Sequence, residues 1–375
     1  MNVSDWLLDS DPAIRWQVKR DLLRESPEVV AAERSKVATE GWGARLLALQ
    51  GPTGQWGRDG IPPVDRSVGL PDPATRKLLR EVLGISVEGL GSHIGVDPQT
   101  LAEWEETDPP KEDELADKYR GAVAWMWGGI GTYNPAWTST THTLVLLRDM
   151  GVDPANERVR RAVELVRDNA KWDDDGQDYF DGESEPCVNG KTVATGVYFG
   201  QNVDGIVERL LGEQLEDGGW NCEAVNGSVR SSFHSTIEVI EGLLEYETSG
   251  KGKHDVRGAR LRAQEYLLAR RLFRRRSTGE TVNEEWTSFS YPTRWHYDVL
   301  RGLDYLRKAG AQADERVSDA IDLVESKRQQ DGRWLLENSH QGRVHFEMDE
   351  GDGKPSKWNT LRALRVLDWY GRTAL

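Results

Sequence analysis

A glycine-containing turn that ends in tryptophan occurs three times along the chain and sets the spacing of its other elements. The copies span residues 50–56, 214–220 and 329–334, and residues 174–177 form a degraded fourth copy. Segments with helical periodicity flank each copy. Helix pairs joined by a recurring turn, with a period of roughly 40–65 residues, are typical of a repeat architecture in which neighbouring units share a core.

Two kinds of helix are predicted around these turns. One kind has a single apolar stripe and a charged far face, as in residues 159–166 and 317–324. The other kind is apolar almost all round and is expected to be buried on every side. Its clearest examples are residues 141–150, 235–246, 298–308 and 359–370. Further helices are predicted after Asp11-Pro12, to about Leu23, and over residues 29–50. With almost no strand signal, the chain is predicted to be all-α.

The repeated Gln-x-x-Asp-Gly-x-Trp turns and six helix pairs resemble the α/α toroid superfamily. This superfamily includes squalene and other terpenoid cyclases, protein prenyltransferase β subunits and lanthionine-forming cyclases. The resemblance covers residues 1–60 and 121–375. It implies an (α/α)6 toroid, a barrel of six inner and six outer helices with a central cavity open at one end. Inner helices are expected to begin near residues 12, 140, 190, 235, 298 and 359.

Residues 65–120 interrupt this pattern and are similar to the helix-turn-helix of the phage-repressor-like (XRE) family. Residues 75–82 form the first helix, Ser86 caps the second, Gly91 lies at the helix crossing and Gly95 makes the turn. The segment has seven basic and thirteen acidic residues, and residues 97–108 contain no Lys or Arg. Because affinity for DNA depends largely on neutralising phosphates, a packing module is favoured over a DNA-binding one, and a protein partner of the insert is an open alternative.

Cys187, Cys222 and His234 are the strongest candidates for a metal site. Each lies where a loop meets a predicted helix, and zinc at reactive sites takes three protein ligands with one position left open. The resemblance implies zinc at the cavity mouth, as in prenyltransferases and lanthionine cyclases. In the lanthionine enzymes the second cysteine and the histidine are adjacent, whereas here eleven residues separate them. The alternative is two unreactive cysteines and a histidine bonded to backbone.

Residues at the starts of the inner helices are candidates for catalysis and for the cavity wall. His296 is a possible fourth ligand, and Asp298 is either a general acid or a helix N-cap. His142 and Asn359 are expected to face the cavity, either as catalytic groups or as part of its wall. Four aromatic residues are expected to line an apolar substrate cavity, or alternatively to pack between the layers: Trp137, Phe233, Trp295 and Trp358.

Magnesium is not expected as a cofactor. Asp174, Asp175 and Asp178 spell the diphosphate–magnesium motif of class I terpene synthases, but here it falls in a glycine-containing turn. Those enzymes carry the motif on a helix. The protonating Asp-x-Asp-Asp motif of squalene-type cyclases is absent from the sequence, which argues against polyene cyclisation.

The composition fits an acidic, cytoplasmic protein. The formal charge is −15, no apolar window approaches the ~20 residues that span a bilayer, and no signal peptide is expected. We therefore expect zinc-assisted transfer or cyclisation of an apolar or thiol-bearing substrate. The alternatives are a ligand-sensing regulator, whose inserted module contacts DNA or a protein, and a non-catalytic interaction scaffold.

Overall fold

The computed structural model describes residues 2–58, 61, 70–172 and 176–372, and within them every regular element is helical. The all-α prediction is therefore confirmed. None of these helices is both long enough and apolar enough to cross a membrane. Short 3₁₀ turns connect several of the α-helices, which are α1 (Val3–Leu8), α2 (Pro12–Asp21), α3 (Pro27–Ser35), α4 (Gly41–Ala48), α5 (Pro73–Val82), α6 (Val87–Ile94), α7 (Pro98–Trp104), α8 (Glu114–Gly129), α9 (Thr140–Met150), α10 (Glu157–Asn169), α11 (Pro186–Tyr198), α12 (Asp204–Gly212), α13 (Phe233–Ser249), α14 (Arg257–Leu268), α15 (Val299–Lys308), α16 (Ser318–Ser326) and α17 (Lys357–Tyr370).

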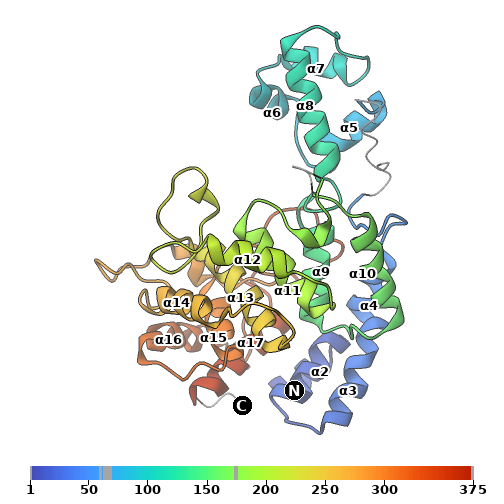
Figure 1. Ribbon diagram of the computed structural model, residues 1–375. Coiled ribbons are helices and arrows are strands. Elements are labelled where there is room, and N and C mark those ends of the chain that lie inside the picture. The colour runs from blue at the N-terminus through green and yellow to red at the C-terminus, as the bar shows by residue number, and fades with distance from the viewer. Residues whose placement is uncertain (1, 59–60, 62–69, 173–175, 373–375) are drawn as a thin grey trace.

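Six helices, α2, α9, α11, α13, α15 and α17, each contact the next, and the last contacts the first. Helix α9 packs on α11, α11 on α13, α15 on α17, and α17 on α2 near the other end of the chain (Figure 1). The Trp16 indole of α2 donates to the Met150 carbonyl of α9, at 2.8 Å. Arg301 of α15 pairs with Glu238 of α13, at 2.9 Å. These contacts bring residues from six separate parts of the chain around one centre.

The three tryptophan turns have the same hydrogen bonds. Trp56, Trp220 and Trp334 are fully buried, and each indole donates to a carbonyl ten residues earlier, at 2.7 Å. Each tryptophan backbone amide also donates to a threonine hydroxyl in the first turns of a following helix, in α9, α13 and α17. The turn therefore ties the end of one helix to the start of another, which explains why its sequence recurs.

The prediction of a single helix over residues 29–50 is wrong. The structure has two helices there, α3 and α4, with a turn between them. Gly41 has a φ of +64°, and a Cβ there would meet the Asp11 carboxylate at 2.0 Å. That carboxylate accepts a hydrogen bond from the Trp42 amide at 2.7 Å. The cap of α2 therefore also fixes the start of α4, and only glycine fits the position between them.

Helices α5–α8 form the inserted module and stand apart from the rest of the molecule (Figure 1). They share a separate apolar core that includes Leu79, Leu101 and Trp104. The predicted local features are confirmed: Ser86 caps α6, and Gly95 follows it with a φ of +75°. Helix α8 continues past the predicted boundary at residue 120 and contributes Val123 and Met126 to this core. Residues 65–69 lie outside the described residues.

Helix α7, which the sequence predicts to be the second element of a helix-turn-helix, has an acidic exposed side. Asp97, Gln99 and Glu103 are exposed, and the helix contains no Lys or Arg. The basic Arg80 is instead buried against Glu105, at 2.5 Å, inside the module. The charges that would neutralise DNA phosphates are therefore missing from this helix.

Candidate metal centre and central cavity

The two cysteines of the chain lie side by side. Cys187 is in the first turn of α11, and Cys222 begins a short 3₁₀ helix after the second tryptophan turn. Their sulfurs are 2.9 Å apart, and a Glu185 carboxylate oxygen lies 3.3 Å from the Cys187 sulfur. One ligand atom from each of Glu185, Cys187 and Cys222 falls within 4.8 Å of the other two. The tryptophan turn before α13 carries Cys222 to the start of α11, so the pairing follows from the repeat.

The environment favours deprotonation of one thiol before the other. The pKa of Cys222 is lowered because the Cys187 thiol and the Ser235 hydroxyl hydrogen bond to its thiolate. The pKa of Cys187 is raised by the same bond to Cys222 and then by burial. Lys191, one helical turn further along α11, acts in the opposite direction and lowers the pKa of Cys187. The pair therefore carries one negative charge more readily than two, unless a cation joins it.

His234 does not belong to this group. Its Nδ1 accepts a hydrogen bond from the Tyr297 amide at 2.9 Å, and it also bonds to the Trp295 backbone. Both contacts come from the loop before α15 and hold the ring against that loop. Among the described residues, Glu185 stands with the two cysteines where the sequence predicted His234.

Two thiols and a carboxylate are a donor set suited to Zn²⁺. Zinc binds thiolate and carboxylate in four-coordinate sites, and reactive zinc sites use three protein ligands with a fourth position open. Cys187 and Cys222 are both free and only partly buried, so a fourth ligand can approach from solvent. Magnesium prefers oxygen ligands and does not fit this set.

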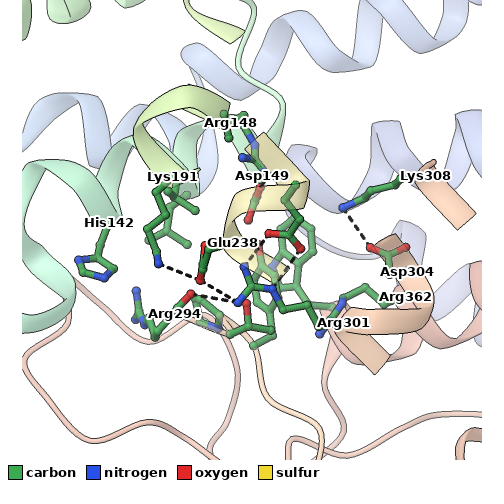
Figure 2. Close-up of a pocket in the computed structure, with 18 of the residues that line it drawn as sticks. His142, Arg148, Asp149, Lys191, Glu238, Arg294, Arg301, Asp304, Lys308 and Arg362 are labelled. Carbon is green, nitrogen blue, oxygen red and sulfur yellow. Dashed lines mark hydrogen bonds and ion pairs between the residues drawn. The ribbon is translucent and has the colours of Figure 1, made fainter. Parts of the chain in front are cut away.

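A cavity of about 90 Å³ lies among α2, α9, α11, α13, α15 and α17, and charged groups dominate its wall (Figure 2). This differs from the apolar, aromatic cavity that the sequence predicts. The inner helices are buried, but they are not apolar all round. Seven basic and four acidic residues line the cavity: Arg148, Lys191, Arg294, Arg301, Lys308, Arg362, Arg365, Asp149, Glu238, Glu241 and Asp304.

Arg301 is the centre of the largest ion-pair network in this wall. It donates to Glu241 at 2.6 Å and to Glu238 at 2.9 Å, and Lys191 lies 2.8 Å from the same Glu238 oxygen. Although burial opposes its charge, the two glutamates raise the pKa of Arg301 well above its usual value. Helices α11, α13 and α15 are therefore held together by charge as well as by apolar packing.

The predicted wall residues are divided between several environments. Of the four predicted aromatic residues, only Trp358 lines the central cavity, where it stacks on Tyr291 with ring centroids 4.3 Å apart. Trp137 and Trp295 line a separate groove of about 540 Å³. Phe233 is buried against Trp286 and Tyr297. The Asn359 amide donates to the carbonyls of Phe289 and Leu335, which gives it a packing role instead of a place on the cavity wall.

The three predicted catalytic residues also lie in different parts of the structure. His142 lines the central cavity, where its Nδ1 hydrogen bonds with the Ser139 hydroxyl at 2.9 Å. His296 lies in the groove, stacked on Trp295 and on His340. Asp298 is buried and caps α15 by accepting a hydrogen bond from the Arg301 amide at 2.7 Å. The N-cap alternative describes the observed position of Asp298.

We expect acid to destabilise the groove through its stacked histidines. Burial, followed by nearby positive groups, lowers the pKa of His296 to about 3 and that of His340 to about 4. Both values lie below the ordinary 6.5, so each histidine takes up a proton when the chain unfolds in mild acid. The stabilisation from the neutral rings is complete above pH 6.5 and is lost as the pH falls toward 4.

The measurement is the free energy of unfolding between pH 7 and pH 4. In His296→Gln the free energy of unfolding should fall less steeply with decreasing pH than in the wild type. The difference in slope should correspond to at most about one proton fewer taken up on unfolding. The control is His93→Gln in the inserted module, where the histidine is exposed. Equal slopes for His296→Gln and the wild type would contradict the predicted titration.

Sequence reasoning missed most of the charged cavity, although a signal was present. Charged residues occur at i, i+3 spacing within helices that are otherwise apolar, as in Glu238/Glu241, Arg301/Asp304 and Arg362/Arg365. That spacing places both members of a pair on one face. In the diphosphate-like motif, Asp174 and Asp175 lie outside the described residues, whereas Asp178 pairs with Lys171.

No model of a known protein family matches this sequence, and no curated protein matches it significantly.

Proposed function

We propose that this protein is a zinc-dependent enzyme with an α/α-toroid fold that acts on a thiol-bearing substrate by transfer or cyclisation. The observation that carries the proposal is the group of Cys187, Cys222 and Glu185, in which the start of α11 meets the 3₁₀ turn that precedes α13. The closed sequence of helix contacts and the recurring tryptophan turns support the toroid. Of the two substrate classes expected from the sequence, the charged cavity favours the thiol-bearing one over the apolar one.

The chain's own groups determine what this site can do. Cys222 gives up its proton first, so it is the first sulfur available to a cation. Lys191 lies one turn below Cys187 and favours its thiolate as well. Ser235 holds the Cys222 sulfur in place at 3.3 Å. Zinc, when bound, supplies a positive centre that keeps a substrate thiol in its nucleophilic thiolate form at neutral pH.

His142 is placed to orient the substrate. Burial, then Lys191 and Arg294, lowers its pKa well below the usual value, so the ring is neutral in the folded protein. Its Nε2 has no hydrogen-bond partner among the described residues and borders the cavity. A neutral imidazole can either donate or accept one hydrogen bond there, depending on which nitrogen carries the hydrogen.

The test is the metal content of the purified protein, measured by elemental analysis after dialysis against a weak chelator. We expect about one zinc per chain, lost in Cys222→Ser and in Cys187→Ser because two thiolates supply most of the affinity. The matched control is His234→Gln, which should keep its zinc because the ring is bonded to backbone. A wild-type protein that binds no zinc when zinc is supplied would refute the proposal.

A further inference from the structure

Among the described residues, one basic side chain of the central cavity makes no ion pair. Six of the cavity's seven basic side chains have an acidic partner within 4.0 Å: Arg148 with Asp149, Lys191 with Glu238, Arg301 with Glu238 and Glu241, Lys308 with Asp304, Arg362 with Asp298, and Arg365 with Asp21. Among the described residues, no side chain forms an ion pair or hydrogen bond with the Arg294 guanidinium. The guanidinium carbon of Arg294 lies over the Trp137 ring, 5.1 Å from its centroid.

The Arg294 side chain and backbone are both in an unfavourable environment. Burial lowers the pKa of its guanidinium to about 10, because the charge is removed from water without a bonded partner. Its φ of +57° is in the left-handed region, which a non-glycine residue rarely adopts. Such strain is retained where the surrounding structure imposes it, and it is commonly found at binding sites.

Three neutral polar groups border the same cavity without partners. The Nε2 of His142, the hydroxyl of Tyr291 and the indole nitrogen of Trp358 are buried and make no hydrogen bond to the described residues. They come from α9, from the loop before α15 and from α17. Folded proteins leave few buried polar atoms unpaired, so three around one small cavity indicate a missing ligand.

The unpaired groups lie close to the charged ones. Figure 2 shows His142, Lys191 and Arg294 together on one side of the cavity. Both cations act on the pKa of His142, and Arg294 also acts on the pKa of Tyr291, as expected for near neighbours. Most of these groups are hydrogen-bond donors, and an arginine fork matches the paired oxygens of a carboxylate or a phosphate.

We propose that this cavity binds an oxyanion, a carboxylate or phosphate group, between Arg294, Lys191 and His142, and that this group belongs to the thiol-bearing substrate. Its assignment to a substrate rests on the proposed function, whereas the anion site itself does not. A volume of about 90 Å³ suits a small group and is far below the roughly 300 Å³ or more of pockets that enclose larger ligands.

The anion and metal sites are arranged along one helix. Lys191 follows Cys187 by four residues on α11, which is a rise of about 6 Å along the helix axis. A short molecule can therefore place its anionic group in the cavity and its thiol near Cys187 and Cys222. The substrate class is a small thiol acid or thiol phosphate, or a larger molecule ending in one.

The test is isothermal titration calorimetry of the full-length protein, with and without zinc, against sodium phosphate and sodium acetate, with sodium chloride as the reference salt. We expect one of the two oxyanions to bind with 1:1 stoichiometry, and the one that binds identifies the class. Arg294→Gln should weaken binding at least tenfold, and Arg294→Lys should weaken it less because the charge remains. The matched control, Arg276→Gln, makes the same change at an exposed arginine and should leave binding unchanged.

Two outcomes would overturn the inference: neither oxyanion binds, or Arg294→Gln, with an unchanged melting temperature, binds as tightly as the wild type. Should Arg294→Gln fail to fold, the inference is tested instead by comparing the melting temperature of the wild type in phosphate, in acetate and in chloride. A rise with one oxyanion alone supports the site, and equal values overturn it. Anion binding by a protein that takes up no zinc refutes the proposed function and leaves this site standing. Zinc uptake without anion binding refutes the anion site and leaves the proposed function standing.

The link between the sites is tested with mercaptoacetate on the zinc-loaded protein. Mercaptoacetate should bind at least tenfold more tightly than 2-mercaptoethanol, which has the thiol without the charge. Equal affinities would show that the thiol site and the cavity do not act on one ligand.

Discussion

An Arg301→Met variant is expected to lose more than about 3 kcal/mol of unfolding free energy, because it leaves buried carboxylates without their partner. Arg301 is 6% exposed and bonds to both Glu238 and Glu241, which are on the adjacent α13. Lys191 can still compensate Glu238, but Glu241 loses its only close cation among the ion pairs that the structure shows. Methionine fills a similar volume, so the loss reports mainly on charge and not on a cavity.

The measurement is the urea midpoint of the variant at neutral pH, with the denaturant slope checked for change. Arg316→Met is the matched control, since Arg316 makes two ion pairs at the surface, with Asp314 and Glu265. Surface pairs contribute about 0–1 kcal/mol, so the control should unfold close to the wild type. A similar small change in Arg301→Met would show that the buried network does not hold these helices together.

Replacing Trp220 with alanine should lower the unfolding free energy by about 3–5 kcal/mol, the range for deleting a fully buried large aromatic side chain. The side chain is 0% exposed, and its indole bonds the end of α12 through the Leu210 carbonyl. Its backbone amide bonds Thr236 in α13. The same turn positions Cys222 two residues later, so we also expect this variant to bind zinc more weakly than the wild type.

Trp125→Ala provides the control for this substitution. Trp125 is 54% exposed on the inserted module and lies far from the repeat turns in the sequence, so its loss should change stability by less than about 1 kcal/mol. Urea unfolding of both variants, followed by far-UV circular dichroism, compares them directly. Equal destabilisation by the two substitutions would contradict the conclusion that the tryptophan turns stabilise the fold by connecting successive helices.

Local signals in the sequence were enough to predict most of the helices. The cap at Asp11 and the turn glycine Gly95 act within a few residues of their positions, and the tryptophan turn recurs with the same residues, so these features can be recognised along the chain. The break between α3 and α4 could not be found in this way. It arises because Gly41 approaches Asp11, thirty residues earlier, and no local pattern shows that contact.

The site was harder to predict because it depends on side-chain direction. The repeat predicted that Cys187 and Cys222 lie near the starts of neighbouring helices. Their sulfurs do lie together, although Cys222 is in a 3₁₀ turn ahead of α13 and not in that helix. His234 was expected beside them, but the Tyr297 amide, sixty-three residues later, holds its ring elsewhere. Glu185 was overlooked although it is only two residues before Cys187. The charged residues of the cavity wall lie in helices that the sequence predicts to be apolar almost all round.

The central claim is that Cys187 and Cys222 would hold a zinc ion that leaves one coordination position for a substrate thiol. X-ray absorption at the zinc edge measures this most directly, because sulfur and lighter ligands differ in distance, at about 2.3 Å and about 2.0–2.2 Å. We predict two sulfur ligands in the resting protein and a third when mercaptoacetate is added. A zinc without sulfur ligands, or one whose sulfur count does not change on addition of the thiol, would contradict the account.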